Sequence, residues 1–289
     1  MSEPRVALLI DADNTSGTLA AAVVAEAARH GRLVIRRMYG DWTTTALQKW
    51  KAVVADHAIQ PMQQFANTAG KNSTDSALII DAMDLLHGDA ADVFCIASSD
   101  ADFTRLASRL RENAKVVVGI GHRQTPKAFV QACERFVFVE NLVSAMVGDA
   151  AEPTTKAASI RTGSPSKTGR GNLGRIPNSA RAKLAASADG PALARGVVAS
   201  AAAVSPEVPA ADLQALLAKA YDNAEEDAGF ANLGKVGNQL VRLDPSFDSR
   251  TFGYRQLRQL VAAQAGYRIE IQSDSGNLVV IRDDAAAGL

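Results

Sequence analysis

The first half of the chain alternates short apolar runs with helical patterns, and this alternation restricts the fold more than any other feature. The runs are rich in β-branched residues, as buried strands are. They are VALLI, LVIRRMY, IQPMQQF, VFCIAS, KVVVGIG and FVFVE. Helical patterns lie between them, at 17–30, 43–57, 74–87, 103–113 and 126–133. Such alternation implies right-handed crossovers between parallel strands, so we expect an open, Rossmann-like α/β sandwich.

The C-terminal part of the chain has a different pattern. Residues 210–228, 234–243 and 254–265 are predicted to be helices. YRIEIQ and NLVVIRD follow, joined by SDSG, which is a hairpin turn signal. Three helices followed by a hairpin predict a small α+β domain of the winged-helix type.

The segment between these two parts is basic and poor in large apolar residues. The chain has 31 Lys and Arg and 31 Asp and Glu. Residues 1–145 hold 15 basic and 16 acidic residues, residues 146–196 hold 8 and 3, and residues 197–289 hold 8 and 12. We therefore expect two folded domains, 1–145 and 205–284, joined by a flexible linker at 146–204. The linker could be a solubilising tether or an electrostatic grip on a phosphate backbone.

Composition limits the cellular setting. Hydrophobic residues make up 47% of the chain, which is enough for a core, and no apolar run is long enough to span a membrane. The N-terminus, MSEPRVALLID, lacks the basic region and apolar core of a secretion signal. Cys95 and Cys133 lie in apolar surroundings and are predicted to be buried, reduced thiols. These features predict a cytoplasmic protein with no membrane partner.

Aspartates follow two of the predicted strands directly. Asp11 and Asp13 come after VALLI, Asp100 and Asp102 come after VFCIAS, and Asp75 lies in the first turn of the helix 74–87. In open parallel sheets, functional groups gather beyond the carboxyl ends of the strands. If VALLI and VFCIAS are neighbours, Asp11 and Asp100 converge, and like charges this close require a cation or a raised pKa. Carboxylate oxygens without nearby Cys or His favour Mg²⁺ or Mn²⁺.

Each of these polar residues also has a structural interpretation. Asp13, Asp75 and Asp102 are suited to turns or helix N-caps. Asp81 could support the site as readily as bind a metal, and Asp84 is expected on a solvated helix face. The candidate substrate-binding residues, some of which could equally form a plain turn, are Asn14, Thr15, Ser98 and Ser99.

The remaining motifs carry little chemistry. Surface or helix-end positions account for His30, His57 and His87, whereas His122 follows KVVVGIG and could line the crevice. The chain has no GxxxxGK[ST] phosphate loop, so nucleotide hydrolysis is unsupported.

Three motifs together resemble the NYN domain, a PIN-like nuclease domain whose members include the LabA-like group. They are LLIDADNT, KNSTDSALIIDAMDLL and IASSDADF, and residues 5–141 follow the family order. Family members usually have Gly where this chain has Ser99. The resemblance implies a metal-binding acidic cluster that cleaves RNA. Its metal-binding and catalytic residues would be Asp11, Asp75, Asp100 and Asp102, accompanied by Asn14.

The C-terminal part is similar to the LOTUS domain, also called OST-HTH. The residues that match the family pattern are Phe247, Asp248, Arg250, Phe252 and Gly253. The resemblance implies RNA binding or recruitment of a protein partner. This part is net acidic, so duplex DNA binding through a basic recognition helix is not favoured. Arg255 and Arg258 are placed on the third helix, where they could contact RNA or simply form salt bridges.

Together these features predict a metal-dependent endoribonuclease that acts on single-stranded or structured RNA. Two alternatives stay open. DADNT also fits the D-x-D-x-T motif of haloacid-dehalogenase-type phosphatases, in which Asp11 would be the nucleophile and Asp13 the general acid. That interpretation needs a lysine at the site, and Lys115 opens its strand at the wrong end. The other alternative is a non-catalytic RNA-binding regulator. Oligomeric state is left open.

Overall fold

The computed structural model describes residues 3–45, 47–65, 73–149, 210–226, 229–272 and 276–282. The predicted linker at 146–204 lies almost wholly outside the described residues. The two folded parts are therefore described separately, as an N-terminal domain (residues 3–149) and a C-terminal domain (residues 210–282).

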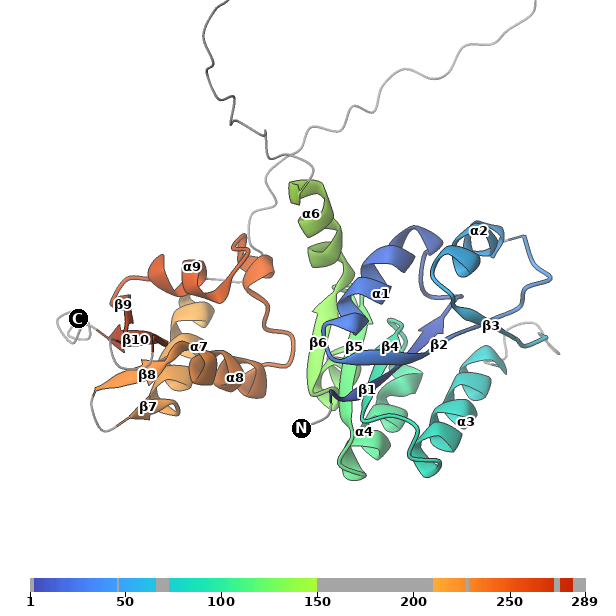
Figure 1. Ribbon diagram of the computed structural model, residues 1–289, viewed down its shortest axis with the longest axis horizontal. Coiled ribbons are helices and arrows are strands. Elements are labelled where there is room, and N and C mark those ends of the chain that lie inside the picture. The colour runs from blue at the N-terminus through green and yellow to red at the C-terminus, as the bar shows by residue number, and fades with distance from the viewer. Residues whose placement is uncertain are drawn as a thin grey trace, which may run out of the picture. The chain divides into compact units, whose positions relative to one another are not determined.

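The N-terminal domain contains a six-stranded sheet in which every neighbouring pair is parallel, in the order β3-β2-β1-β4-β5-β6 (Figure 1). All six predicted strands are present. They are β1 (Arg5–Asp11), β2 (Arg32–Gly40), β3 (Gln60–Gln63), β4 (Val93–Ala97), β5 (Val116–Gly121) and β6 (Arg135–Phe138). The sheet confirms the predicted α/β fold class, and β1 and β4 are neighbours at its centre.

Helices cover both faces of this sheet. The alternation of side chains along β1 shows the two faces: Val6, Leu8 and Ile10 point into one core, and Ala7 and Leu9 into the other. The first core is covered by η1 (Gly17–Leu19), α1 (Ala20–Ala28), α2 (Gln48–Asp56) and α6 (Val139–Asp149). The second is covered by α3 (Ser73–His87), η2 (Ala101–Phe103), α4 (Thr104–Glu112) and α5 (Lys127–Ala132).

Two predicted boundaries in this domain were wrong. The strand predicted over FVFVE ends at Phe138, and α6 begins at Val139, because Val139 and Leu142 pack as one helical face into the first core. The helix predicted from residue 43 begins only at Gln48. Thr43 instead donates to the Asp41 carboxylate through its hydroxyl (2.6 Å), which forms a turn before the helix.

The C-terminal domain is a small α+β domain with an antiparallel sheet, ordered β7-β8-β10-β9. Its helices are α7 (Ala210–Asp222), α8 (Leu233–Leu243), η3 (Ser249–Phe252) and α9 (Leu257–Ala262). Its strands are β7 (Glu225–Glu226), β8 (Phe230–Asn232), β9 (Tyr267–Ile271) and β10 (Leu278–Arg282). The predicted hairpin is β9–β10. The first predicted helix is shorter than expected because the chain turns after Asp222 to form β7 and β8.

The motif residues of the C-terminal domain build the turn around η3. Phe247 is buried, and Asp248 caps η3 by accepting from the Arg250 backbone N–H at 2.8 Å. The Arg250 guanidinium pairs with the same carboxylate. Gly253 ends η3 at φ +84°, a left-handed conformation that favours glycine. Arg255 precedes α9, so the prediction that it lies on the third helix was wrong.

The two cysteines are as the sequence predicts. Cys95 and Cys133 are free and buried, and burial raises the pKa of the Cys133 thiol to about 12. Within the described ranges, no helix has both the length and the apolar character needed to cross a bilayer.

Candidate metal centre

The candidate site lies at the carboxyl edge of the parallel sheet, where the strand order changes direction. From β1 the chain continues to β2 and β3 on one side, whereas β4 continues to β5 and β6 on the other. Ligands of such sheets bind outside the carboxyl ends of the strands at this point. Asp11 is the last residue of β1, and Asp100 lies three residues beyond β4.

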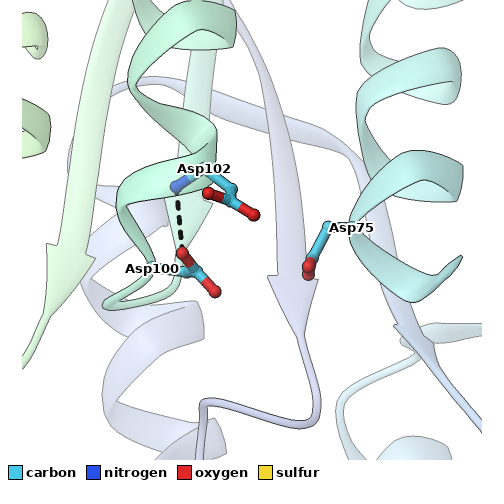
Figure 2. Close-up of side chains that lie close together, drawn as sticks. All are labelled: Asp75, Asp100 and Asp102. Atoms are coloured by element: carbon cyan, nitrogen blue, oxygen red, sulfur yellow. Dashed lines mark hydrogen bonds between the residues drawn. The ribbon is translucent and has the colours of Figure 1, made fainter. Parts of the chain in front are cut away.

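Three carboxylates converge at this edge. Asp75, Asp100 and Asp102 each offer an oxygen atom, and these oxygens lie within 4.8 Å of one another. Figure 2 shows Asp75 projecting from the start of α3 toward Asp100 and Asp102, which lie at η2. The exposure of the side chains rises from Asp75, which is buried, to Asp102, which is exposed. The cluster is thus open to solvent on one side, as a site for a large substrate must be.

Local hydrogen bonds fix the two acids at η2. Asp100 is the N-cap of this short helix and accepts from the Asp102 backbone N–H at 2.9 Å (Figure 2). The Asp100 backbone N–H in turn donates to the Ser98 hydroxyl at 3.1 Å. Capping by Asp100 leaves the Asp102 side chain at the start of the helix, beside that of Asp100. Asp100 can therefore cap η2 and belong to the acidic cluster at the same time.

The cluster is electrostatically costly without a cation. The pKa of Asp75 is raised to about 6, chiefly by burial and in addition by the charges of Asp11, Asp100, Asp102 and Asp13. A carboxylate placed among four others loses solvation and gains repulsion. A bound cation would relieve both, so the geometry and the charges fit a metal ion.

Asp11 occupies a different environment from the other three predicted ligands. Its side chain is fully buried and is not one of the three convergent carboxylates. It accepts from the Asn14 side-chain amide at 2.7 Å, the Ser98 hydroxyl at 2.8 Å and the Asp13 backbone N–H at 3.0 Å. Burial raises the pKa of Asp11, and these hydrogen bonds oppose that rise. Asp11 therefore contributes a charge that acts on Asp75 and a hydrogen-bond link to Asp100 through Ser98. Direct metal ligation by Asp11 stays a prediction.

The four residues predicted to bind substrate hold the site together in this structure. Asn14 and Ser98 donate to Asp11, as described above. Thr15 is buried and its hydroxyl donates to the Ala97 carbonyl at 3.1 Å, which ties the loop after β1 to β4. The Ser99 hydroxyl accepts from the His122 backbone N–H at 2.8 Å, which ties β4 to β5. Contact of these four residues with a substrate stays a prediction.

The two remaining acids of α3, Asp81 and Asp84, lie in different environments. Asp84 is exposed, as expected for a solvated face. Asp81 forms an ion pair with Arg37 and accepts from the Tyr39 hydroxyl, which anchors α3 to β2. The sequence offered no signal for these two partners, because they come from another element more than 40 positions away. Asp81 therefore has a structural partner set of its own, apart from the three convergent carboxylates.

We expect Asp81→Ala to lower the free energy of unfolding by about 3 kcal/mol without changing metal affinity. The substitution leaves the Arg37 guanidinium and the buried Tyr39 hydroxyl without their acceptor. Urea denaturation would measure the stability, and Mn²⁺ titration of the folded protein would measure the affinity. The matched control is Asp84→Ala, on the exposed face of the same helix. Unchanged stability with weakened Mn²⁺ binding would instead make Asp81 a metal ligand.

The phosphatase interpretation has no support from the lysine that it requires. Lys115 pairs with Asp89 at 2.6 Å, next to the ion pairs of Arg5 with Asp89 and Asp92. All these residues lie at the amino end of the strands, opposite the acidic cluster. His122 lies at the carboxyl end, but its ring contacts Glu140 at 3.0 Å, not the three convergent acids.

Two domain families match this chain. The NYN domain model matches residues 5–140, and the OST-HTH/LOTUS domain model matches residues 205–279. A crystal structure of a protein of unknown function from Vibrio parahaemolyticus is 18% identical, covering 47% of this chain and 93% of that one, with a TM-score of 0.40. A solution structure of an uncharacterized protein from Nitrosomonas europaea is 29% identical over 32% of this chain and 90% of that one, with a TM-score of 0.25. The search of curated proteins found no match.

Proposed function

Because the chain carries an NYN domain followed by an OST-HTH/LOTUS domain, we propose that it is a metal-dependent endoribonuclease. The reaction would be hydrolysis of RNA phosphodiester bonds at the carboxyl edge of the N-terminal sheet. The observation that carries the proposal is the convergence of Asp75, Asp100 and Asp102 at this edge, in a domain of the PIN-like nuclease type.

Mg²⁺ or Mn²⁺ is the proposed cofactor. The donor set consists of carboxylate oxygens alone, which hard divalent cations prefer. Asp75, Asp100 and Asp102 would hold the ion. When bound, such an ion activates water and neutralises charge on phosphate oxygens.

The other residues of the site would position these ligands. Asp100 would keep its place through its cap on η2. The Ser98 hydroxyl would connect Asp100 to Asp11, because it accepts from the Asp100 backbone N–H and donates to the Asp11 carboxylate. The charge of Asp11 would strengthen the attraction of the cluster for a cation. Asn14 would hold the Asp11 carboxylate in place through its side-chain amide.

The C-terminal domain would hold the RNA. An OST-HTH domain is a nucleic-acid-binding module, which supports this role. A protein partner is the alternative for this domain. The domain is net acidic, so any contact with RNA would depend on particular basic side chains, such as the exposed Arg258 on α9, not on an overall positive field.

The proposal is tested by incubating the full chain with labelled single-stranded and structured RNA in Mg²⁺, in Mn²⁺ and in EDTA. We expect cleavage that requires the metal and is lost in Asp100→Asn. Asp84→Asn is the matched control, since it removes an exposed aspartate of α3, the helix that carries Asp75, and Asp84 is not part of the cluster. Full activity is expected in this control.

Two results would contradict the proposal. Cleavage that survives both EDTA and Asp100→Asn would come from a contaminating nuclease. RNA binding without cleavage under any of these conditions would favour a non-catalytic RNA-binding regulator.

A further inference from the structure

A polar pocket opens beside the acidic cluster, between the loop after β1 and the start of α2. It measures about 670 Å³, within the range of about 300–1,000 Å³ typical of small-molecule sites. Its polar lining comes from Asp13, Asn14, Thr15 and Ser16 on one side and from Thr45 and Gln48 on the other. The Asp75–Asp100–Asp102 cluster does not line it, so the pocket is separate from that cluster.

The base of the pocket is rigid. Trp50 is 2% exposed, and its indole N–H donates to the Thr15 carbonyl at 3.0 Å. Thr15 is fixed in turn to β4 through the Ala97 carbonyl. Leu47, 3% exposed, packs with Trp50 in the core below. Since buried side chains hold both walls, the pocket exists before any ligand arrives.

Several side chains at the mouth have unused hydrogen-bonding capacity. Asp13, Thr45 and Gln48 line the pocket, and their side chains form no hydrogen bond within the described part of the chain. Together they offer a carboxylate, a hydroxyl and an amide. An amide and a hydroxyl both donate and accept, which is the combination that reads the edge of a nucleobase.

The charge of the lining excludes phosphate as its main ligand. Among the described residues, none that lines the pocket is Lys or Arg, and the single charged one is Asp13. A phosphate would therefore meet repulsion and no compensating cation. Base edges and ribose hydroxyls are uncharged and present N–H and O–H donors, which a carboxylate and amide oxygens accept.

Two residues of the pocket, Asp13 and Asn14, relate it to the acidic cluster. Asp13 lines it and is also one of the acids whose charge acts on Asp75. Asn14 lines it and donates to Asp11, whose charge also acts on Asp75. A group bound here is therefore next to the position where a phosphodiester would lie.

We infer that this pocket binds the base and ribose of the nucleotide adjoining the scissile phosphate, with Gln48 and Thr45 contacting the base. The inference rests on the proposed function for the position of the scissile bond. It goes beyond that function because it makes cleavage selective for the nucleotide at one position. Gln48 is the specificity-determining residue of the pocket.

Two measurements on the full chain test this. The first maps cleavage sites in a random single-stranded RNA pool with Mn²⁺. We expect the wild type to prefer certain nucleotides at one position beside the cut. Gln48→Ala should reduce this preference by about two- to tenfold, the value of one neutral hydrogen bond, while total cleavage continues. Gln124→Ala is the matched control, an exposed glutamine at the same edge of the sheet but outside the pocket.

The second measurement does not depend on cleavage. Adenosine, guanosine, cytidine and uridine are titrated separately into ¹⁵N-labelled protein, and the Trp50 indole and Gln48 amide signals are followed. We expect both signals to shift in the wild type, and we expect the shift of the Trp50 indole signal, which both proteins have, to be smaller in Gln48→Ala. If the protein binds nucleosides but cuts no RNA, the inference about the pocket holds and the proposed nuclease activity is contradicted. Cleavage whose nucleotide preference survives Gln48→Ala, or shifts caused by inorganic phosphate and not by nucleosides, would overturn the inference.

Discussion

Asp75→Asn is expected to abolish RNA cleavage and, at the same time, to stabilise the metal-free protein. Even residues that only support a metal site typically contribute 10- to 100-fold to affinity or activity, so loss of a ligand should lower kcat/KM by more than about 100-fold. The gain in stability has a separate cause. Asp75 is buried beside other acids, and its asparagine counterpart carries no charge to desolvate.

The sign of the stability effect follows from the pKa. The pKa of Asp75 is raised from 3.8 to about 6 in the fold, chiefly by burial. The stability that the neutral form contributes is fully present below 3.8 and is lost as the pH rises through about 6. Well above pH 6, Asp75→Asn should therefore raise the free energy of unfolding, on the order of 1 kcal/mol, as relief of a strained functional site commonly does.

With metal bound, we expect the wild type to be more stable than Asp75→Asn. A cation that binds only the folded wild type stabilises it in proportion to the logarithm of its concentration, and the variant lacks a ligand for it. Urea denaturation in EDTA and then in excess Mn²⁺ would measure both effects, with Asp84→Asn as the control that shows neither. If Asp75→Asn were destabilising in EDTA, the carboxylate would be a structural group and not a strained ligand.

The two central strands of the N-terminal domain, β1 and β4, were predictable because they are buried on both faces. A strand with helices above and below must be apolar at every position, and VALLI and VFCIA are continuous apolar runs for this reason. The adjacency of β1 and β4 could not be predicted from these runs, since it depends on where the chain crosses back over the sheet. The prediction that Asp11 and Asp100 approach one another depended on that adjacency.

Alternation along β1 explains why Asp11 and Asp100 differ in role. Asp11 has the same parity as Ala7 and Leu9, so it points toward the face covered by α3 and is fully buried. Asp100 lies beyond the last paired residue of β4, where the backbone has already turned into η2. Asp11 is therefore buried as a strand residue, whereas Asp100 lies in the turn after its strand.

The end of the last predicted strand was wrong because tertiary packing overrode local propensity. FVFVE is apolar and β-branched throughout, so propensity favours a strand up to Glu140. Tertiary packing decides otherwise, because Val139 and Leu142 fill one helical face against the core of α1. The pocket residues Thr45 and Gln48 were also missed, since a polar loop before a helix has no pattern that distinguishes a binding wall from an ordinary turn.

Metal affinity is expected to fall steeply as the pH drops through about 6. A carboxylate must be deprotonated to bind a cation, and burial together with four neighbouring acids brings the pKa of Asp75 to about 6. Well above this pH the apparent dissociation constant for Mn²⁺ should be constant. Below it, the constant should rise about tenfold for each pH unit, since one proton must leave for each ion bound. Isothermal titration calorimetry at a series of pH values would give both limbs.

The cause of this pH dependence can be isolated in the metal-free protein by following the Asp75 carboxyl carbon with NMR. Asp102 is exposed, and its charge is one of those that raise the pKa of Asp75, so Asp102→Asn removes a repulsion without opening the core. The midpoint for Asp75 should then move below 6 but stay above 3.8, because burial is the larger cause and the substitution leaves it in place. A midpoint at 3.8 in the wild type would mean that Asp75 is neither desolvated nor repelled. In that case the three carboxylates would not be held together before the cation arrives.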